Sequence, residues 1–229
     1  MKKLIQHVIL IAISTPCIAL AGVDKVYDPY VEQGETEIEL RGIHQFDNAD
    51  SHAVKLGIGY GVNAFWAVEG YVVADESPGR DAKIREAELE NRFQLTEKGQ
   101  YWLDLGVLTE LEKKLSDDLW ELKAGPVVQK QFSAWVATLN LLLEKQFGSD
   151  RIDDDTDILT RAQIKYRLSP AVEPGIEYYN DESTSAAGPV LLGRTNWGSS
   201  RTRWTVGVLA GLNDTTADTI ARWELEWEF

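Results

Sequence analysis

The last segment of the chain, residues 219–229, alternates strictly between apolar and polar side chains. In a β-strand successive side chains point to opposite faces, whereas in a helix these two sets would mix around the axis. The segment therefore predicts a strand with one apolar and one charged face. The apolar face carries Ala221, Trp223, Leu225, Trp227 and Phe229, and the charged face carries Arg222, Glu224, Glu226 and Glu228.

The same two-faced pattern recurs along most of the chain, in segments of about ten residues separated by stretches rich in Gly, Pro, Asn, Asp and Ser. The Glu-rich segment 83–95 has helical propensity, but its alternation favours a strand. The count is twelve strands, with ten as an alternative, because 188–194 is short and because Pro126 and Pro174 lie inside strands. The predicted strands are 35–46, 52–61, 64–74, 83–95, 101–112, 119–130, 133–147, 157–168, 171–180, 188–194, 202–212 and 219–229.

Residues 1–21 have the features of a cleaved signal peptide. Lys2 and Lys3 precede an apolar stretch, which ends in the small-residue pattern Ala19-Leu20-Ala21. The single cysteine, Cys17, lies within this stretch, so the exported chain is expected to contain no thiol. Residues 22–34 are expected to form an N-terminal periplasmic segment, which could hang free, cap the barrel or thread inside it. No connection between strands is long enough to predict an inward-folded plug.

The alternation alone does not decide which face meets water. A soluble sandwich would bury the apolar face, whereas a membrane barrel would turn it toward lipid. With the N-terminus on the periplasmic side, aromatic residues gather near both ends of the strands, as membrane interfaces favour. These are Tyr60, Trp66, Tyr101, Trp135, Tyr166, Trp204, Trp227 and Phe229 at one end, and Phe46, Trp120, Phe147 and Tyr178 at the other.

The stretch Trp223-Glu-Leu-Glu-Trp-Glu-Phe229 resembles the C-terminal signal of Gram-negative outer-membrane barrels, in which alternating hydrophobic residues finish in a terminal Phe. The resemblance implies an all-β fold over residues 35–229, a closed antiparallel up-and-down transmembrane β-barrel with short loops. It also implies outer-membrane location, contact with outer-membrane lipids, and insertion by the barrel assembly machinery. That machinery would read Trp223, Leu225, Trp227 and Phe229 as the membrane-insertion signal.

In such a barrel the charged faces would line the lumen. The charges could pair into a network that fills a narrow barrel, or excess acids could line a passage for cations or small cationic solutes. The predicted lumen-lining residues are Glu37, Glu39, Arg41, Glu86, Glu88, Glu90, Arg92, Asp104, Arg161, Lys165, Arg167, Glu173, Glu177, Arg203, Arg222, Glu224 and Glu226.

The formal net charge of −14 argues against nucleic-acid binding, which requires basic surfaces. The first predicted hairpin carries His44, Asp47, Asp50 and His52, which could hold a transition metal. With Ser51 the cluster has the minimum inventory of an outer-membrane hydrolase. No cofactor is expected. The sequence favours a non-enzymatic passive channel or transport-associated barrel, with a closed structural or interaction barrel as the first alternative.

Overall fold

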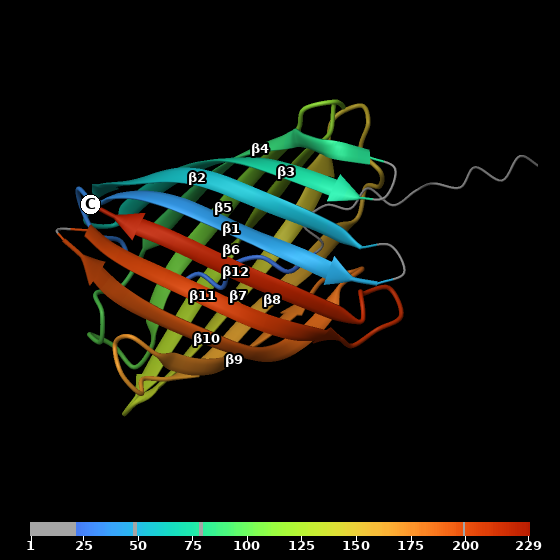
Figure 1. Cartoon of the computed structure of the whole chain (residues 1–229). Helices are drawn as coiled ribbons and strands as arrows, with labels where there is room; N and C mark the ends of the chain where they lie inside the picture. The colour runs from blue at the N-terminus through green and yellow to red at the C-terminus, as the bar shows by residue number, and fades with distance from the viewer. Residues whose placement is uncertain (1–21, 48–49, 78–79, 199) are drawn as a thin grey trace, which may run out of the picture.

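A computed structural model describes residues 22–47, 50–77, 80–198 and 200–229. Within these ranges the chain forms a single closed barrel of antiparallel strands, each paired with its neighbours in sequence (Figure 1). None of the described residues forms a helix long and apolar enough to cross a membrane. The strands are β1 (Thr36–Phe46), β2 (Ser51–Asn63), β3 (Trp66–Ser77), β4 (Arg80–Gln94), β5 (Asp104–Lys114), β6 (Trp120–Phe132), β7 (Trp135–Phe147), β8 (Thr156–Tyr166), β9 (Glu173–Asn180), β10 (Ser185–Trp197), β11 (Ser200–Gly211) and β12 (Thr219–Glu228).

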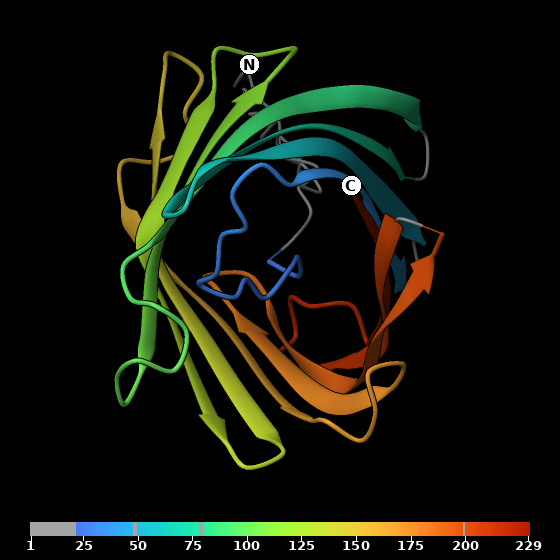
Figure 2. The same cartoon turned by 90° about the vertical axis from the view of Figure 1, so that its left-hand side faces the viewer.

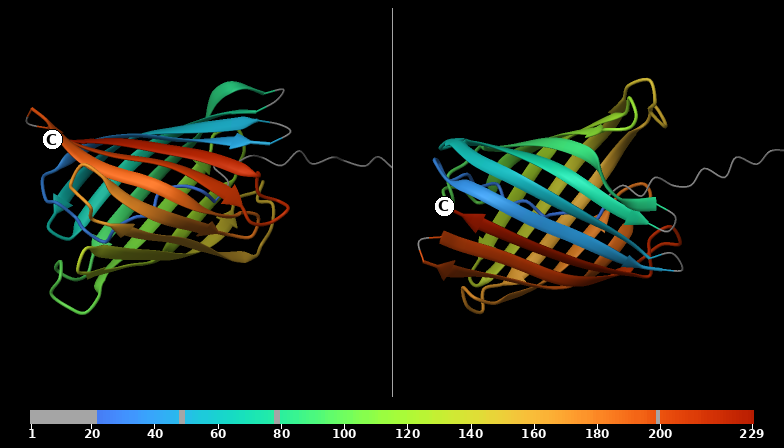
Figure 3. Two further views of the ribbon diagram at one scale, coloured as in Figure 1. Left: turned by 60° about the horizontal axis from the view of Figure 1, so that its bottom comes forward. Right: turned by 45° about the horizontal axis from the view of Figure 1, so that its top comes forward.

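Pairing of β1 with β12 closes the barrel, and the two strands run side by side in several views (Figures 1 and 3). Their register sets Glu39 opposite Glu226 and Leu40 opposite Leu225, so charged and apolar residues keep separate faces across the seam. Closure leaves no edge strand whose backbone groups lack partners, which is what a sheet in lipid needs. The predicted all-β up-and-down barrel is confirmed.

The structure decides the strand count in favour of twelve. The strand predicted at 188–194 is part of β10, which runs from Ser185 to Trp197. Pro126 lies in β6 where pairing with β7 skips Gly125 and Pro126, because proline has no N–H to donate. The strand predicted from Tyr101 begins only at Asp104, since Tyr101 lies in the preceding turn.

The two faces of the wall differ as the alternation predicts. Along β5 and β12, buried and more exposed residues alternate without a break. The outward positions carry large apolar side chains that are exposed, among them Ile58, Leu143 and Ile158. Cross-strand aromatic pairs lie at the strand ends: Trp66 with Phe93, Trp120 with Phe147, and Trp135 with Tyr166.

Candidate functional site

The N-terminal segment, residues 22–34, lies inside the barrel. Viewed along the barrel axis, it is the blue coil within the ring of strands (Figure 2). Val23 and Tyr27 have no exposed surface, and Asp24 and Lys25 are each 8% exposed. The expected periplasmic segment therefore threads through the lumen, one of the three placements that the sequence left open. This segment fills the middle of the lumen, and Ala217 of the turn between β11 and β12 packs against its first residues.

The segment crosses the length of the barrel. We call the end of the barrel that carries Thr36 and Phe229 the terminal end. The segment reaches this end at Gly34, whose N–H donates to the carbonyl of Gly61. Gly22 lies at the opposite end, where an added Cβ would stand 1.9 Å from Asp181 Oδ2. Its φ of +59° also favours glycine, so Gly22 fits a position that a side chain would disrupt.

Lys25 is held by three acidic side chains from the strands that close the barrel. Its Nζ pairs with Glu39 of β1, lies 2.9 Å from Glu226 of β12, and lies 3.7 Å from Glu224. Carboxylate oxygens of these three residues lie within 4.8 Å of one another, close enough to bind a cation together. We call Glu39, Glu224 and Glu226 the anionic cage, and the Lys25 ammonium occupies it.

Asp24 is held by side chains of the opposite charge. One carboxylate oxygen lies 2.8 Å from Arg41 Nε, and the other lies 3.3 Å from Lys55 Nζ and 3.9 Å from Arg161 Nη1. We call Arg41, Lys55 and Arg161 the cationic cage. The Arg41 guanidinium also contacts Glu39 at 2.6 Å, so the two cages adjoin.

Tyr27 anchors the segment by polar and apolar contacts. Its hydroxyl donates to Glu90 Oε1 at 2.5 Å and accepts from Arg41 Nη2 at 3.0 Å. Asn140 pairs with its main chain on both sides, accepting from the N–H at 2.9 Å and donating to the carbonyl at 2.8 Å. The tyrosine belongs to a buried cluster with Leu108, Val127, Leu142 and Leu159.

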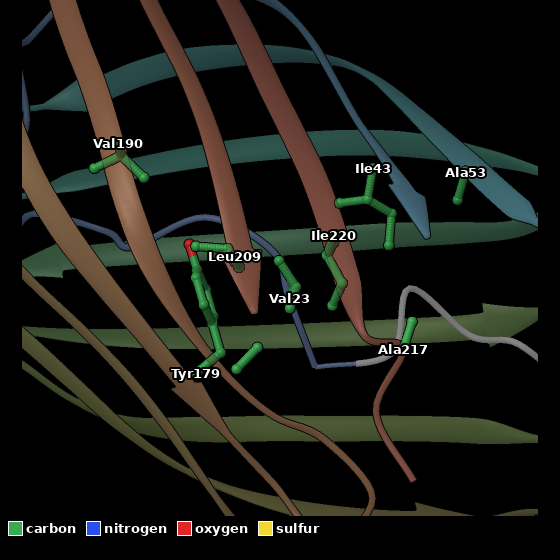
Figure 4. Close-up of a cluster of buried hydrophobic side chains, with 9 residues drawn as sticks. Val23, Ile43, Ala53, Tyr179, Val190, Leu209, Ala217 and Ile220 are labelled. Atoms are coloured by element: carbon green, nitrogen blue, oxygen red, sulfur yellow. The ribbon is translucent and has the colours of Figure 1, made fainter. Parts of the chain in front are cut away.

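Val23 provides a second apolar anchor. Figure 4 shows it among side chains from the wall and from the β11–β12 turn, including Tyr179, Leu209 and Ile220. Burial of such side chains stabilises by about 1.5–3 kcal/mol each. The segment is therefore held by two apolar clusters that flank a pair of opposite charges.

Other buried charges also form ion pairs, some across the lumen and some between neighbouring strands. Arg161 of β8 contacts Glu110 of β5 at 2.8 Å, and Lys55 of β2 contacts Glu88 of β4 at 2.6 Å. These pairs join strands that are not neighbours in the wall. The others include Arg92 with Glu69, Lys114 with Glu86, Lys123 with Glu112, and Arg222 with Glu177.

Two cavities lie at opposite ends of the interior and share no lining residue. The cavity away from the terminal end has a volume of about 210 Å³, and acidic residues predominate in its wall. The cavity at the terminal end has about 360 Å³, with acidic and basic residues in similar number. The first is lined by Asp24, Glu86, Glu88, Glu112, Glu121, Glu144, Asp153, Asp157, Asp181 and Glu182, with Lys55, Lys114, Lys123 and Arg161 as bases.

The residues predicted to line the lumen differ in burial. Most are buried, and Arg92, Lys165, Arg167, Glu173 and Arg203 line the cavity at the terminal end. Sequence reasoning missed the contribution of Asp24, Lys25 and Tyr27, because residues 22–34 show no strand period that would assign a face. The predicted insertion-signal residues Trp223, Leu225 and Trp227 alternate with the buried charges of β12, and Phe229 follows the strand.

The histidine cluster does not form the predicted metal site within the described residues. His52 Nε2 lies 3.2 Å from Glu76, and the His44 and His52 rings stack with centroids 6.0 Å apart. The groupings that could hold a metal consist of glutamates alone, and His44, Asp47, Asp50 and His52 are not among them. Ser51 is buried and donates to Gln45, whereas His52 is exposed, so the geometry gives the hydrolase alternative no support.

Three acidic side chains share Arg201 at the terminal end. Arg201 lies 2.8 Å from Glu32 and 2.5 Å from Glu35, and it also pairs with Glu228. The hydrogen bond from Arg201 lowers the pKa of Glu32. Burial, reinforced by the charge of Glu228, raises the pKa of Glu35 to about 7. This rim therefore gains negative charge as the pH rises through neutrality.

Comparison with known proteins adds evidence on the fold. No protein-family model matches the chain, and no curated protein matches it in sequence. An outer membrane channel from Pseudomonas putida F1 is similar in structure, with a TM-score of 0.64, 13% identity, and coverage of 90% of this chain and all (100%) of that one. The KdgM porin in complex with disordered oligogalacturonate has a TM-score of 0.56 at 11% identity, covering 84% of this chain and 98% of that one.

A second structure of the KdgM porin gives a TM-score of 0.52 at 12% identity, with coverage of 84% and 98% of the two chains. At these identities the likeness establishes the fold. The chain thus has the architecture of outer-membrane channel proteins, as the C-terminal resemblance implies.

Proposed function

We propose that this protein is an outer-membrane channel whose lumen is closed at rest by its own N-terminal segment. The observation that carries the proposal is the pair of interior cavities, one at each end, separated by residues 23–27. These residues belong to no strand of the wall and are held by side-chain contacts. Their displacement would join the two cavities without breaking any strand pairing.

The apolar outer surface and the channel fold support a position in the outer membrane. The proposed signal peptide, residues 1–21, lies outside the described residues. With the start of β1 on the periplasmic side of the membrane, the terminal end of the barrel faces the periplasm. Phe229 then ends the strand that the assembly machinery would recognise. Outer-membrane lipids would cover the exposed apolar face.

The charge of the two cavities supports a preference for cations. The cavity away from the terminal end would face outward, and its acidic wall would raise the local concentration of cations or small cationic solutes. Because that wall also contains four basic side chains in ion pairs with acids, the preference is expected to be moderate.

Single-channel recording in a planar lipid bilayer tests the proposal. The native protein is expected to be mostly closed, because the segment keeps its ion pairs. Asp24→Asn combined with Lys25→Gln removes the attraction of the segment for both cages, while Arg41 keeps Glu39 and Lys55 keeps Glu88. This double variant should show frequent, cation-selective openings.

Asp81→Asn combined with Lys83→Gln is a matched control, since it neutralises an exposed acidic and basic pair at the start of β4. It should conduct like the native protein. Folded but silent native and double-variant barrels would contradict the channel. They would favour the alternative of a closed structural or interaction barrel, which the extensive pairing of buried charges also suits.

A further inference from the structure

The N-terminal segment occupies the middle of the barrel as a bound peptide would. Successive residues place a carboxylate in the cationic cage and an ammonium in the anionic cage. Arg41 and Glu39 form the boundary between the cages, so opposite charges adjoin in the wall as they do in the segment. Such a site is complementary to a ligand that carries both charges close together.

The wall also recognises peptide features besides charge. Asn140 satisfies both the N–H and the carbonyl of Tyr27, as a neighbouring strand would. Apolar clusters receive the side chains before and after the charged pair. Main-chain recognition together with alternating side-chain sites is the usual arrangement for binding extended peptides.

Arg41 belongs to the cationic cage and also contacts Glu39 of the anionic cage. Contacts with the barrel wall hold it in place independently of the segment. Its guanidinium lies 4.7 Å from the ring centroid of Tyr71, a contact that favours a cation. Gly57 makes room for this ring, because an added Cβ there would lie 2.2 Å from Tyr71 Cδ1. The cage is therefore preorganised, which lowers the cost of binding a ligand.

We propose that this site binds short peptides with an acidic residue followed directly by a basic one, and that the N-terminal segment is its intramolecular occupant. The inference rests on the proposed channel function, since it names the solute class that the open passage would select. A solute of this class would compete with the segment and thereby favour the open state. Solutes with one charge would satisfy one cage and leave the other unpaired.

Binding of synthetic peptides to the refolded full-length exported chain tests the inference. The host is the Asp24→Asn, Lys25→Gln variant, whose own segment competes weakly. The probe is a capped, fluorescently labelled pentapeptide with the sequence of residues 23–27, Val-Asp-Lys-Val-Tyr. One control exchanges its acidic and basic residues, and the other replaces them with Asn and Gln. Fluorescence anisotropy should show the native order binding at least tenfold more tightly than either control.

A second measurement covers the case in which the double variant does not fold. In the Val23→Cys variant with native charges, the buried thiol reports displacement of the segment. The pentapeptide with the native order should accelerate maleimide labelling, and neither control peptide should do so.

The outcomes separate the inference from the channel proposal. Equal affinity for all three peptides, or equal acceleration of labelling, overturns the inference, whether or not the bilayer shows openings. Tight binding confined to the native order in a barrel that never conducts supports the site and contradicts the channel. Selective binding together with more frequent openings in the presence of the native-order peptide supports both.

Discussion

Truncation of Tyr27 should release the N-terminal segment from the lumen. Tyr27→Ala removes a fully buried aromatic ring from its cluster with Leu108 and Leu142, and it removes the hydroxyl contact with Glu90. Replacement of a buried aromatic residue by alanine costs about 3–5 kcal/mol. These contacts form only while the segment lies in the lumen. Their loss therefore destabilises the closed state relative to the state in which the segment is released.

The expected change in population follows from that free energy. Since about 1.4 kcal/mol corresponds to a tenfold change in an equilibrium, the population of released segment should rise by roughly two to three and a half orders of magnitude. Tyr27→Phe keeps the ring and loses only its hydrogen bonds to Glu90 and Arg41. Hydrogen bonds to charged groups contribute about 1.5–3 kcal/mol, so its effect should be about one to two orders.

Thiol labelling measures this population. The sequence contains one cysteine, Cys17, within the proposed signal peptide, so Val23→Cys would introduce a single thiol in the exported chain. In the closed state this position is fully buried, and maleimide should react only when the segment leaves. Tyr27→Ala should accelerate labelling up to the rate of an unprotected thiol, with Tyr27→Phe between it and the parent.

Gln33→Ala is the control, because Gln33 is exposed within the same segment and should leave the rate unchanged. If Tyr27→Ala labels no faster than Gln33→Ala while the barrel remains folded, the reasoning that Tyr27 anchors the segment is refuted.

Three further predictions concern stability and assembly. Glu110→Gln leaves Arg161 without its closest acidic partner and should destabilise the barrel by about 3–5 kcal/mol in urea unfolding, whereas Glu97→Gln at an exposed position should not. Phe229→Ala should reduce the heat-modifiable, membrane-integrated fraction in cells without preventing refolding of the purified chain; equal assembly would argue against the insertion signal. Because the pKa of Glu35 in the folded state is about 7, above its ordinary value of 4.5, the folded state retains a proton that the unfolded chain loses. Its contribution to stability is therefore present below pH 4.5 and is lost as the pH rises through 7, and Glu35→Gln should remove this part of the pH dependence of unfolding.

The structure of the lumen shows how far side-chain alternation can be used. It placed Glu88, Arg161 and Glu226 on the charged faces of their strands, and all three side chains are buried, because a period of two fixes the face of each residue once the strand is known. It could not say which charges pair. Glu110 and Arg161 lie on β5 and β8, and their contact depends on the curvature of the closed wall.

The histidine cluster shows a second limit on what the sequence can predict about side-chain partners. His44 and His52 were grouped because they flank one hairpin, and the register does place them opposite each other. The side-chain geometry then pairs His52 with Glu76 of β3, a residue distant from the hairpin in the sequence. Proximity along the chain thus gave no indication of this partner of His52.

By itself the sequence determined a wall of strands with one apolar and one charged face, because successive side chains of a strand point to opposite sides of the sheet. The placement of residues 22–34 was decided only by the tertiary structure. The partners of Asp24, Lys25 and Tyr27 lie on strands from β1 to β12, far apart along the chain, and closure of the barrel brings them together. A segment without periodicity carries no local signal of such a site, since its conformation is set by the cavity that receives it.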